Sequence, residues 1–305
     1  MAPLRHSTER AFLLLILRLT IAIVLGSVTA AMTNPVGSSM TRETFEGLSS
    51  LAQEGFRITQ RLTRAIGGEG MLLAQVMEEG LSDASRHRAR VLLFESQGKW
   101  MRLVRSEEFP WAQLVKIDDI DRDGNLELVF QVSTGGNCWT CNYVQIWSVR
   151  REGVVSVLSP ETFQTVEDLD GDGIVEALAL DTRWEDYSGL CHACSPKFER
   201  VFRPVQGRWV EASQSYTQHY QKSLDALLER LGREEKESGS SWDDYRMGTL
   251  ISILLHRIQL GQATEGWREF DARVENWRGS MLSSAPEQRA HLDEVLNRLR
   301  IDLAR

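Results

Sequence analysis

The pattern of apolar and polar positions divides the chain into two parts. Between about residues 56 and 213, short alternating runs such as "RVLLFES" and "YVQIWSV" are separated by turns that contain glycine. Alternation with a period of two is typical of strands, and a Gly-containing turn between two such runs indicates a β-hairpin. From residue 214 onward the apolar residues recur at helical spacing. The sequence therefore predicts an α+β protein, with a β-rich part followed by a helical domain over 214–305.

The β-rich part shows a degenerate internal period. Three times a glycine precedes a strand-like apolar run, and a second glycine follows 28 to 34 residues later within a hairpin signal; the pairs are Gly70 and Gly98, Gly124 and Gly153, and Gly173 and Gly207. A fixed period of about fifty residues suggests propeller blades or a related array. We therefore expect three β-repeats over 56–213, each holding a loop, a strand and a hairpin.

Four helices are expected in the C-terminal part. The second of them follows Ser241, with Asp244 three residues later in an arrangement that resembles a capping box. The last follows Ser284 as its N-cap and has Pro286 in its first turn. The polar stretch "GREEKESGSS" is expected to link the first two helices, and residues 31–55 are expected to be a linker that includes one short helix.

The N-terminus is typical of a targeting segment. Arginines at positions 5, 10 and 18 lead into the apolar run "LTIAIVLGSV", and small residues follow up to Ala30. This order predicts a secretory signal peptide over residues 1–30. The alternative is an uncleaved anchor over 11–31, but Arg18 inside that span costs roughly 2.5–3.5 kcal/mol on insertion, which favours cleavage. Both interpretations place the body of the protein outside the cytoplasm, in the periplasm or secreted.

Composition and charge narrow the classes of partner. The chain has 305 residues, of which 42% are hydrophobic and 26% charged, as expected for a folded globular protein. Its formal net charge of −8 argues against nucleic acid and against electrostatic docking on anionic lipid. Contact with a membrane is expected only through the N-terminal segment, if that segment stays uncleaved.

Two short stretches carry the clearest candidate chemistry. "DIDRDGNLE" begins at Asp119, and "DLDGDGIVE" begins 49 residues later at Asp168, each just ahead of an apolar run. Carboxylates at positions 1, 3, 5 and 9, with a backbone carbonyl at position 7, supply the hard oxygen ligands that Ca²⁺ prefers. The candidate ligands are Asp119, Asp121, Asp123, Asn125 and Glu127 for a first Ca²⁺ site, and Asp168, Asp170, Asp172, Ile174 and Glu176 for a second. The alternative is that Asp and Gly gather here only because they suit turns.

These loops are not EF-hands, because position 12 is Phe130 in the first and Ala179 in the second, and a strand-like run follows. The pattern D-x-D-x-D-G-x-x-[DE] ahead of a strand instead resembles FG-GAP or VCBS-type repeats, the calcium-bearing blades of integrin α-chains and many exported bacterial proteins. The resemblance implies that the ligands named above hold Ca²⁺. The first repeat has "GGEG" at this place and is expected to hold no metal. Three repeats are too few for a closed propeller, so a partial, propeller-like array is expected unless further blades escape recognition.

The four cysteines form two C-x-x-C pairs, "CWTC" at Cys138 and Cys141 and "CHAC" at Cys191 and Cys194. Both pairs occupy the same place in their repeats, so the two loops are expected to be neighbours. In an exported protein an even count predicts disulfides, and a cross-link between the loops would stabilise by roughly 2–4 kcal/mol. Two alternatives stay open: Zn²⁺ held by four thiolates, although the gap between the pairs is long for a zinc ribbon, and a redox centre, although no βαβ context surrounds either pair.

The remaining residues show no recognisable catalytic motif. H-E-x-x-H, G-x-S-x-G and phosphate-binding glycine loops are absent from the sequence. Four aromatic residues near the cysteines, Trp139, Trp147, Trp184 and Tyr187, are candidates for a sugar-stacking surface or for core packing. The sequence favours an exported protein with structural calcium that binds or assembles with a protein or glycan partner. The alternative is an extracytoplasmic hydrolase or thiol-redox enzyme on a similar scaffold.

Overall fold

The computed structural model describes residues 39–40, 42–66, 70–79, 88–97, 100–157, 163–238, 243–280 and 286–304. The predicted signal peptide, and equally the alternative anchor, lies outside these residues. Within the described segments, no helix combines the length and the apolar character needed to cross a membrane. The described residues fall into two compact units, one reaching to Ile117 and including Glu152–Val154, the other comprising Asp118–Arg151 and the chain from Val155 onward.

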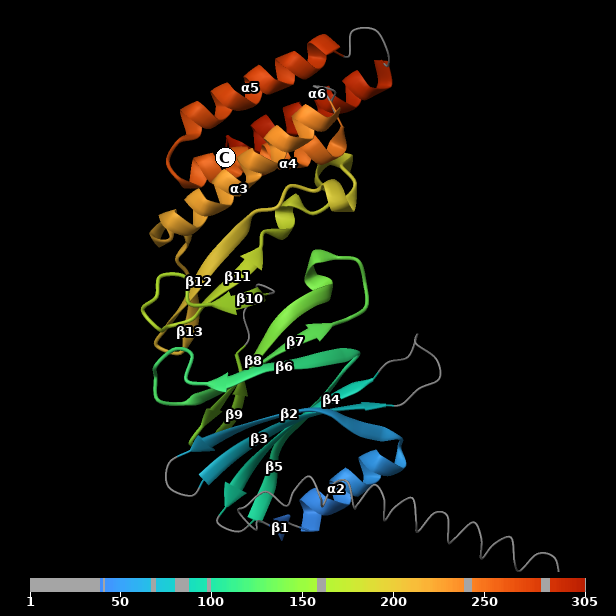
Figure 1. Cartoon of the computed structure of the whole chain (residues 1–305), viewed down its shortest axis with the longest axis vertical. Helices are drawn as coiled ribbons and strands as arrows, with labels where there is room; N and C mark the ends of the chain where they lie inside the picture. The colour runs from blue at the N-terminus through green and yellow to red at the C-terminus, as the bar shows by residue number, and fades with distance from the viewer. Residues whose placement is uncertain are drawn as a thin grey trace, which may run out of the picture. The chain divides into compact units, whose positions relative to one another are not determined.

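The β-rich part forms three sheets, each containing four strands that are consecutive in the chain (Figure 1). The first contains β2 (Phe56–Ile66), β3 (Gly70–Glu79), β4 (Ala89–Gln97) and β5 (Trp100–Phe109), with the short β1 (Ser39–Met40) parallel to β5. The second contains β6 (Trp111–Asp118), β7 (Leu126–Ser133), β8 (Asn142–Arg150) and β9 (Gly153–Ser156). The third contains β10 (Phe163–Glu167), β11 (Glu176–Leu180), β12 (Glu199–Val205) and β13 (Arg208–Glu211).

The C-terminal part consists of α3 (Thr217–Ser238), α4 (Asp244–Gln259), α5 (Ala263–Ser280) and α6 (Pro286–Leu303). The predicted α+β class, with antiparallel sheets followed by helices, is confirmed. The hairpins predicted from alternating runs are β4 with β5, β8 with β9, and β12 with β13. The first strand of each sheet was not identified from the sequence, because β2 carries polar residues at most positions and β10 is only five residues long.

One apolar cluster of the first unit joins a helix to the first sheet. Helix α2 (Arg42–Gln53), which lies within the segment expected to contain a short helix, contributes Leu48 and Leu51. These side chains pack with Phe56 of β2 and with Leu92 and Phe94 of β4, all of which are buried. The helix therefore covers one face of the first sheet.

In the second unit, the β7–β8 pair and the third sheet share a core. Its members include Val129, Ile146 and Phe202 from the strands, together with Ile120 and Val175 from the two carboxylate loops. Anchoring one residue of each loop in this core ties the loop conformations to the packing of the sheets. A separate cluster of Leu178, Val201, Tyr216 and Tyr220 joins the third sheet to the start of α3.

Two details of the helical part differ from the sequence prediction. The expected linker after Gly232 is largely helical, because α3 continues to Ser238; its Arg and Glu side chains form i,i+4 ion pairs such as Arg230 with Glu234. The N-cap of α4 is Asp243, whose carboxylate accepts the backbone N–H of Arg246 at 2.9 Å. The caps predicted at Ser241 and Ser284 lie outside the described residues.

Candidate functional site

The two carboxylate loops, residues 119–127 between β6 and β7 and residues 168–176 between β10 and β11, have the same internal hydrogen bonds. At position 1, Oδ2 of Asp119 accepts the N–H of Gly124 at 3.2 Å, and Oδ2 of Asp168 accepts that of Gly173 at 2.9 Å. Both glycines have positive φ, +89° and +80°, a conformation that a side chain would strain. The Asp at position 1 and the Gly at position 6 therefore specify the turn together.

The acid at position 9 closes each loop from the strand side. Oε2 of Glu127 accepts the N–H of Ile120 at 3.1 Å, and Oε2 of Glu176 accepts the N–H of Leu169 at 2.9 Å. Both glutamates are at least 97% buried. A charged side chain is rarely buried at the start of a strand unless something compensates its charge.

Three carboxylates converge in each loop. Ligand atoms of Asp119, Asp121 and Glu127 lie within 4.8 Å of one another, and so do those of Asp168, Asp170 and Glu176. Six of the predicted ligands are thus brought together in two groups of three that could hold a metal ion.

The other predicted ligands have different roles or stay untested. The carboxylates of Asp123 and Asp172 each accept the backbone N–H two residues on, from Asn125 and Ile174, at 2.8 Å. Such bonds stabilise the turn and leave the second carboxylate oxygen of each residue outside that contact. The backbone carbonyls of Asn125 and Ile174 remain predicted ligands.

The groups fit a bound cation by an independent criterion. Oδ1 of Asp119 and Oε1 of Glu176 are buried, and neither has a hydrogen-bond partner among the described residues. A small cavity lined by Asp121, Glu127 and Ser148 lies beside the first group. Buried acceptors without donors are uncommon in folded proteins, and a cation satisfies them without any donor.

The electrostatics of the two buried glutamates also favour a bound cation. Burial raises the pKa of Glu127 to about 7, although Ser148 and the N–H of Ile120 donate hydrogen bonds to it. Burial likewise raises the pKa of Glu176; the nearby Tyr216 hydroxyl does not reach hydrogen-bonding geometry with it. Positive charge close by would favour the ionised form of both glutamates.

The two loops are neighbours in space. The N–H of Val175 donates to the carbonyl of Ile120 at 2.8 Å, which joins the second loop directly to the first. Arg122 of the first loop also lies against Gly173 of the second, so closely that a Cβ added there would be 1.7 Å from a guanidinium nitrogen. Two groups that are 49 residues apart in sequence thus form one double site.

The second loop differs from the first by an arginine. Arg203 of β12 pairs with Asp172, lies 3.5 Å from Oδ2 of Asp170 and lies 4.0 Å from Oε1 of Glu176. Across the described segments, no lysine or arginine forms an ion pair with the three carboxylates of the first group. The second group is thus partly neutralised by the protein itself, and a cation bound there has to compete with Arg203.

Arg203→Gln is therefore expected to tighten calcium binding at the second loop, with a dissociation constant lower by roughly threefold to tenfold. The measurement is a calcium titration in an Asp121→Asn background, which disables the first loop. Arg200→Gln is the matched control, because Arg200 lies on the same strand but pairs with Glu211. An unchanged or weaker affinity in Arg203→Gln would contradict this account of the second loop.

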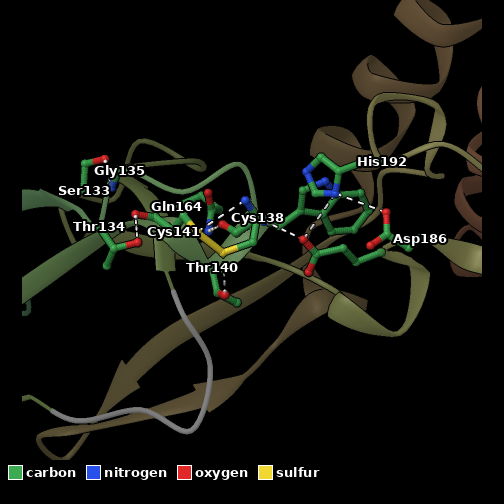
Figure 2. The surroundings of a disulfide bond; sticks show 11 residues. Ser133, Thr134, Gly135, Cys138, Thr140, Cys141, Gln164, Asp186 and His192 are labelled. Atoms are coloured by element: carbon green, nitrogen blue, oxygen red, sulfur yellow. Dashed lines mark hydrogen bonds and ion pairs between the residues drawn. A yellow bond between two sulfur atoms is a disulfide. The ribbon is translucent and has the colours of Figure 1, made fainter. Parts of the chain in front are cut away.

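The cysteines pair within each C-x-x-C motif. Cys138 is bonded to Cys141 (Figure 2), and Cys191 is bonded to Cys194. The cross-link between the two loops that we considered from the sequence is therefore wrong. A Zn²⁺ site would need four thiolates, and all four sulfur atoms are committed to disulfides.

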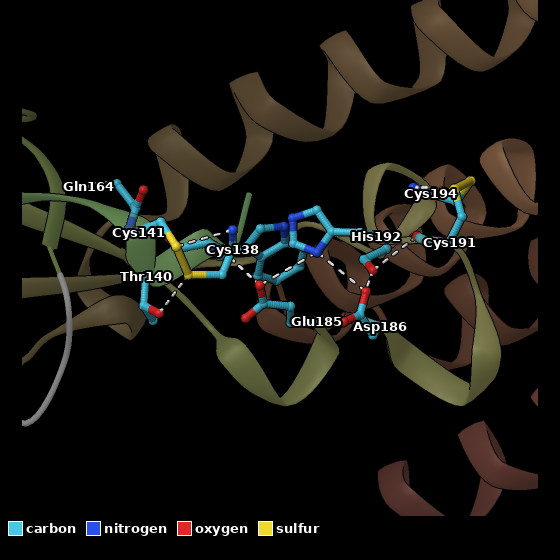
Figure 3. Close-up of polar contacts among 11 residues, drawn as sticks. Cys138, Thr140, Cys141, Gln164, Glu185, Asp186, Cys191, His192 and Cys194 are labelled. Atoms are coloured by element: carbon cyan, nitrogen blue, oxygen red, sulfur yellow. Dashed lines mark hydrogen bonds and ion pairs between the residues drawn. A yellow bond between two sulfur atoms is a disulfide. The ribbon is translucent and has the colours of Figure 1, made fainter. Parts of the chain in front are cut away.

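The expected proximity of the two cysteine loops is nevertheless found. The N–H of Trp139, between the first two cysteines, donates to Oε1 of Glu185 at 2.7 Å. That same oxygen lies 3.5 Å from Nδ1 of His192, which stands between the second two cysteines. Figure 3 shows Glu185, Asp186 and His192 between the two disulfides. Glu185 and Asp186 were not identified from the sequence, because only the fold brings them to the first cysteine loop.

The aromatic residues considered for sugar stacking are core residues. Trp139, Trp147, Trp184 and Tyr187 are each 7% exposed or less. Their faces therefore do not form an open stacking surface.

A larger cavity lies elsewhere in the second unit. It has a volume of about 970 Å³ and is lined by residues of the segment 183–188 and of α4 and α6. On its wall the Tyr187 hydroxyl donates to Asp302 at 3.0 Å, and Arg298 donates to the same carboxylate at 2.8 Å. Two non-glycine residues beside it, Asp186 and Ser188, adopt positive φ of 50°, a strained conformation that is often found at binding sites.

Comparison of the chain with protein-family models, with curated proteins and with solved structures gives no match. The likeness to FG-GAP and VCBS-type repeats therefore depends on the two carboxylate loops themselves.

Proposed function

We propose that this is an exported calcium-binding protein built from FG-GAP or VCBS-type β-repeats, in which two Ca²⁺ ions are structural and the chain serves in binding or assembly. One observation carries the proposal: two loops with the same hydrogen bonds each gather three carboxylates, and each group contains a buried oxygen without a hydrogen-bond partner. A turn formed only by Asp and Gly would not require a buried glutamate at position 9.

Calcium is the ion that the donors favour. All of the convergent side chains offer carboxylate oxygen, and no histidine or free cysteine takes part in either group. Hard oxygen ligands select Ca²⁺ or Mg²⁺, and several carboxylates together with a backbone carbonyl suit the larger ion, which takes six to eight oxygen ligands. Each ion would link the start of a loop to the strand that follows it, through Asp119 and Glu127 or through Asp168 and Glu176.

Export is supported by separate features. The N-terminal order of basic, apolar and small residues is that of a leader, and two disulfides suit an oxidising compartment. Extracellular calcium modules bind with dissociation constants of roughly 10⁻⁴–10⁻³ M, which suits calcium levels outside the cytoplasm. We therefore propose that the mature protein acts in the periplasm or the medium.

The binding role has a candidate location in the cavity of about 970 Å³. Its volume lies in the range of small-molecule sites, and its wall combines the buried Trp184 with the polar group of Tyr187, Arg298 and Asp302. A polar segment of a protein or glycan partner is the class of ligand that this wall would accept.

A calcium titration by calorimetry tests the proposal. Two ions are expected per chain, and one is expected in Asp121→Asn and in Asp170→Asn, because each change removes one of three convergent carboxylates. Asp225→Asn on the exposed side of α3 removes the same charge far from the loop carboxylates in sequence and is expected to keep both ions. Failure of the unmodified protein to take up calcium at millimolar concentration would reject the proposal.

A further inference from the structure

We propose that the Cys138–Cys141 disulfide is a thiol–disulfide exchange site, at which the thiolate of a dithiol attacks Sγ of Cys138 and Cys141 leaves as a thiolate. The proposal does not depend on calcium. It concerns a disulfide that has no part in the proposed function, and it assigns different roles to the two disulfides.

Access to the two sulfur atoms is unequal. Cys138 is half-buried, whereas Cys141 is only 8% exposed. The backbone of Gly136 packs against the Cys141 sulfur, since a Cβ added at Gly136 would lie 2.4 Å from it. The surrounding Gly135, Asn137 and Thr140 are exposed. An incoming thiolate can therefore reach Cys138 from solvent, while Cys141 is covered.

Both sulfur atoms have hydrogen-bonding groups that suit the reduced state. The backbone N–H of Cys138 donates to Sγ of Cys141 at 3.3 Å, so the leaving thiolate is stabilised from the moment that it forms. The hydroxyl of Thr140 lies 3.4 Å from Sγ of Cys138 (Figure 3) and is able to donate to a thiolate there. These donors therefore favour attack at the accessible Cys138 and release of Cys141 as the thiolate.

In the Cys191–Cys194 disulfide the first cysteine is again the more accessible one, but the hydrogen bond to sulfur is reversed. Its exposed member is Cys191, and the backbone N–H of Cys194 donates to that same exposed sulfur at 3.1 Å. Attack at Cys191 would expel Cys194, for which the described residues provide no sulfur hydrogen bond. The carbonyl of Cys194 is also packed against Gly248 of α4. We therefore assign a structural role to the second disulfide.

Hydrogen bonds other than the disulfide also hold the first cysteine loop in its shape. The carbonyl of Cys141 accepts the N–H of Thr134 at 2.8 Å and its hydroxyl at 3.3 Å, which closes the loop at its base. Glu185 accepts the N–H of Trp139, and the side-chain amide of Gln164 donates to the Trp139 carbonyl at 3.0 Å. A disulfide that closes a loop this short also restricts the unfolded chain little. Reduction and reoxidation can therefore proceed in the folded protein.

The reaction balances with a dithiol as the only partner. One thiolate of the dithiol bonds to Sγ of Cys138, and the electron pair of the broken S–S bond moves to Sγ of Cys141. The second thiol then loses its proton, which the Cys141 thiolate takes up, and attacks the partner's own sulfur in the mixed disulfide. Cys138 leaves as a thiolate and is protonated by water. The dithiol becomes a disulfide, and the protein gains two electrons and two protons.

The test titrates the oxidised full-length chain with dithiothreitol as the dithiol, followed by acid quenching, alkylation and peptide mapping. Cys138–Cys141 is expected to be half-reduced at a reductant concentration at least tenfold lower than Cys191–Cys194, with an unchanged circular dichroism spectrum. The proposal would be overturned if both disulfides were reduced together, if the second were reduced first, or if either were reduced only after the protein unfolds.

Variants that lack one cysteine of the first pair distinguish attack at Sγ of Cys138 from attack at Sγ of Cys141. In Cys141→Ser, oxidised glutathione is expected to form a mixed disulfide at Cys138, whereas in Cys138→Ser the covered Cys141 should react at least tenfold more slowly. Thr140→Val is expected to raise the reductant needed for the first disulfide severalfold and to leave the second unchanged. Equal reactivity of the two single cysteines, or no effect of Thr140→Val, would contradict the assigned geometry.

Discussion

Chelation of calcium with excess EGTA is expected to lower the free energy of unfolding of the second unit by about 3–5 kcal/mol. A ligand that binds only the folded state contributes about 1.4 kcal/mol at ten times its dissociation constant and about 2.7 kcal/mol at one hundred times, and the protein has two groups. The loss should be large because Ile120 and Val175 tie both loops to the core shared by the sheets. An ion that leaves a loop therefore weakens the packing on both sides of that core.

Urea unfolding followed by tryptophan fluorescence measures this difference. Trp147 is a suitable reporter, because it is fully buried and packs edge to face on Phe130 with ring centroids 4.9 Å apart. Asp121→Asn and Asp170→Asn are each expected to lose about half of the calcium effect, while Asp225→Asn should keep all of it. Equal stability in calcium and in EGTA would mean that the loops are turns and nothing more.

Gly248→Ala is expected to destabilise the helical part by about 3 kcal/mol, although alanine is the better helix former. Gly248 lies inside α4, where a Cβ would be 1.7 Å from the carbonyl oxygen of Cys194 and 2.9 Å from its carbonyl carbon. These are backbone atoms, so the contact cannot be relieved by rotating a side chain. Ser252 also bonds the same region, accepting the N–H of Lys197 at 2.9 Å.

Gly232→Ala on α3 is the matched control. It is also a glycine inside a helix, but no atom lies within 4 Å of an added Cβ. Its replacement should stabilise by about 0.5–1 kcal/mol through helix propensity alone. Effects of opposite sign in urea unfolding are the expected result. A neutral or stabilising Gly248→Ala would show that α4 does not approach the second cysteine loop as closely as described.

Local features were predictable from the sequence, and contacts between distant segments were not. The carboxylate loops are fixed by bonds that span two to seven residues, such as Asp119 to Gly124 and Glu127 to Ile120, so their pattern is visible in a short stretch. The hairpins and the four C-terminal helices follow from periodicity in the same way. Apolar and polar residues also alternate along the sequence of β6, in step with its burial. No glycine turn precedes this strand, so it was not separated from β5 in the sequence analysis.

The rest depends on the fold. Arg203 reaches Asp172 across 31 residues, and Glu185 reaches Trp139 across 46. The sequence gives no sign of either contact, because Arg and Glu side chains on a strand or loop ordinarily face solvent. The same holds for cysteine connectivity, where four cysteines allow three pairings and only the positions of the loops decide among them.

The most direct test of the central claim is a crystal structure grown in calcium, with anomalous scattering recorded at a long wavelength. We expect one anomalous peak among Asp119, Asp121 and Glu127 and a second among Asp168, Asp170 and Glu176, each at roughly 2.3–2.6 Å from its carboxylate oxygens. Ordered carboxylates without a peak in either group, at millimolar calcium, would contradict that claim.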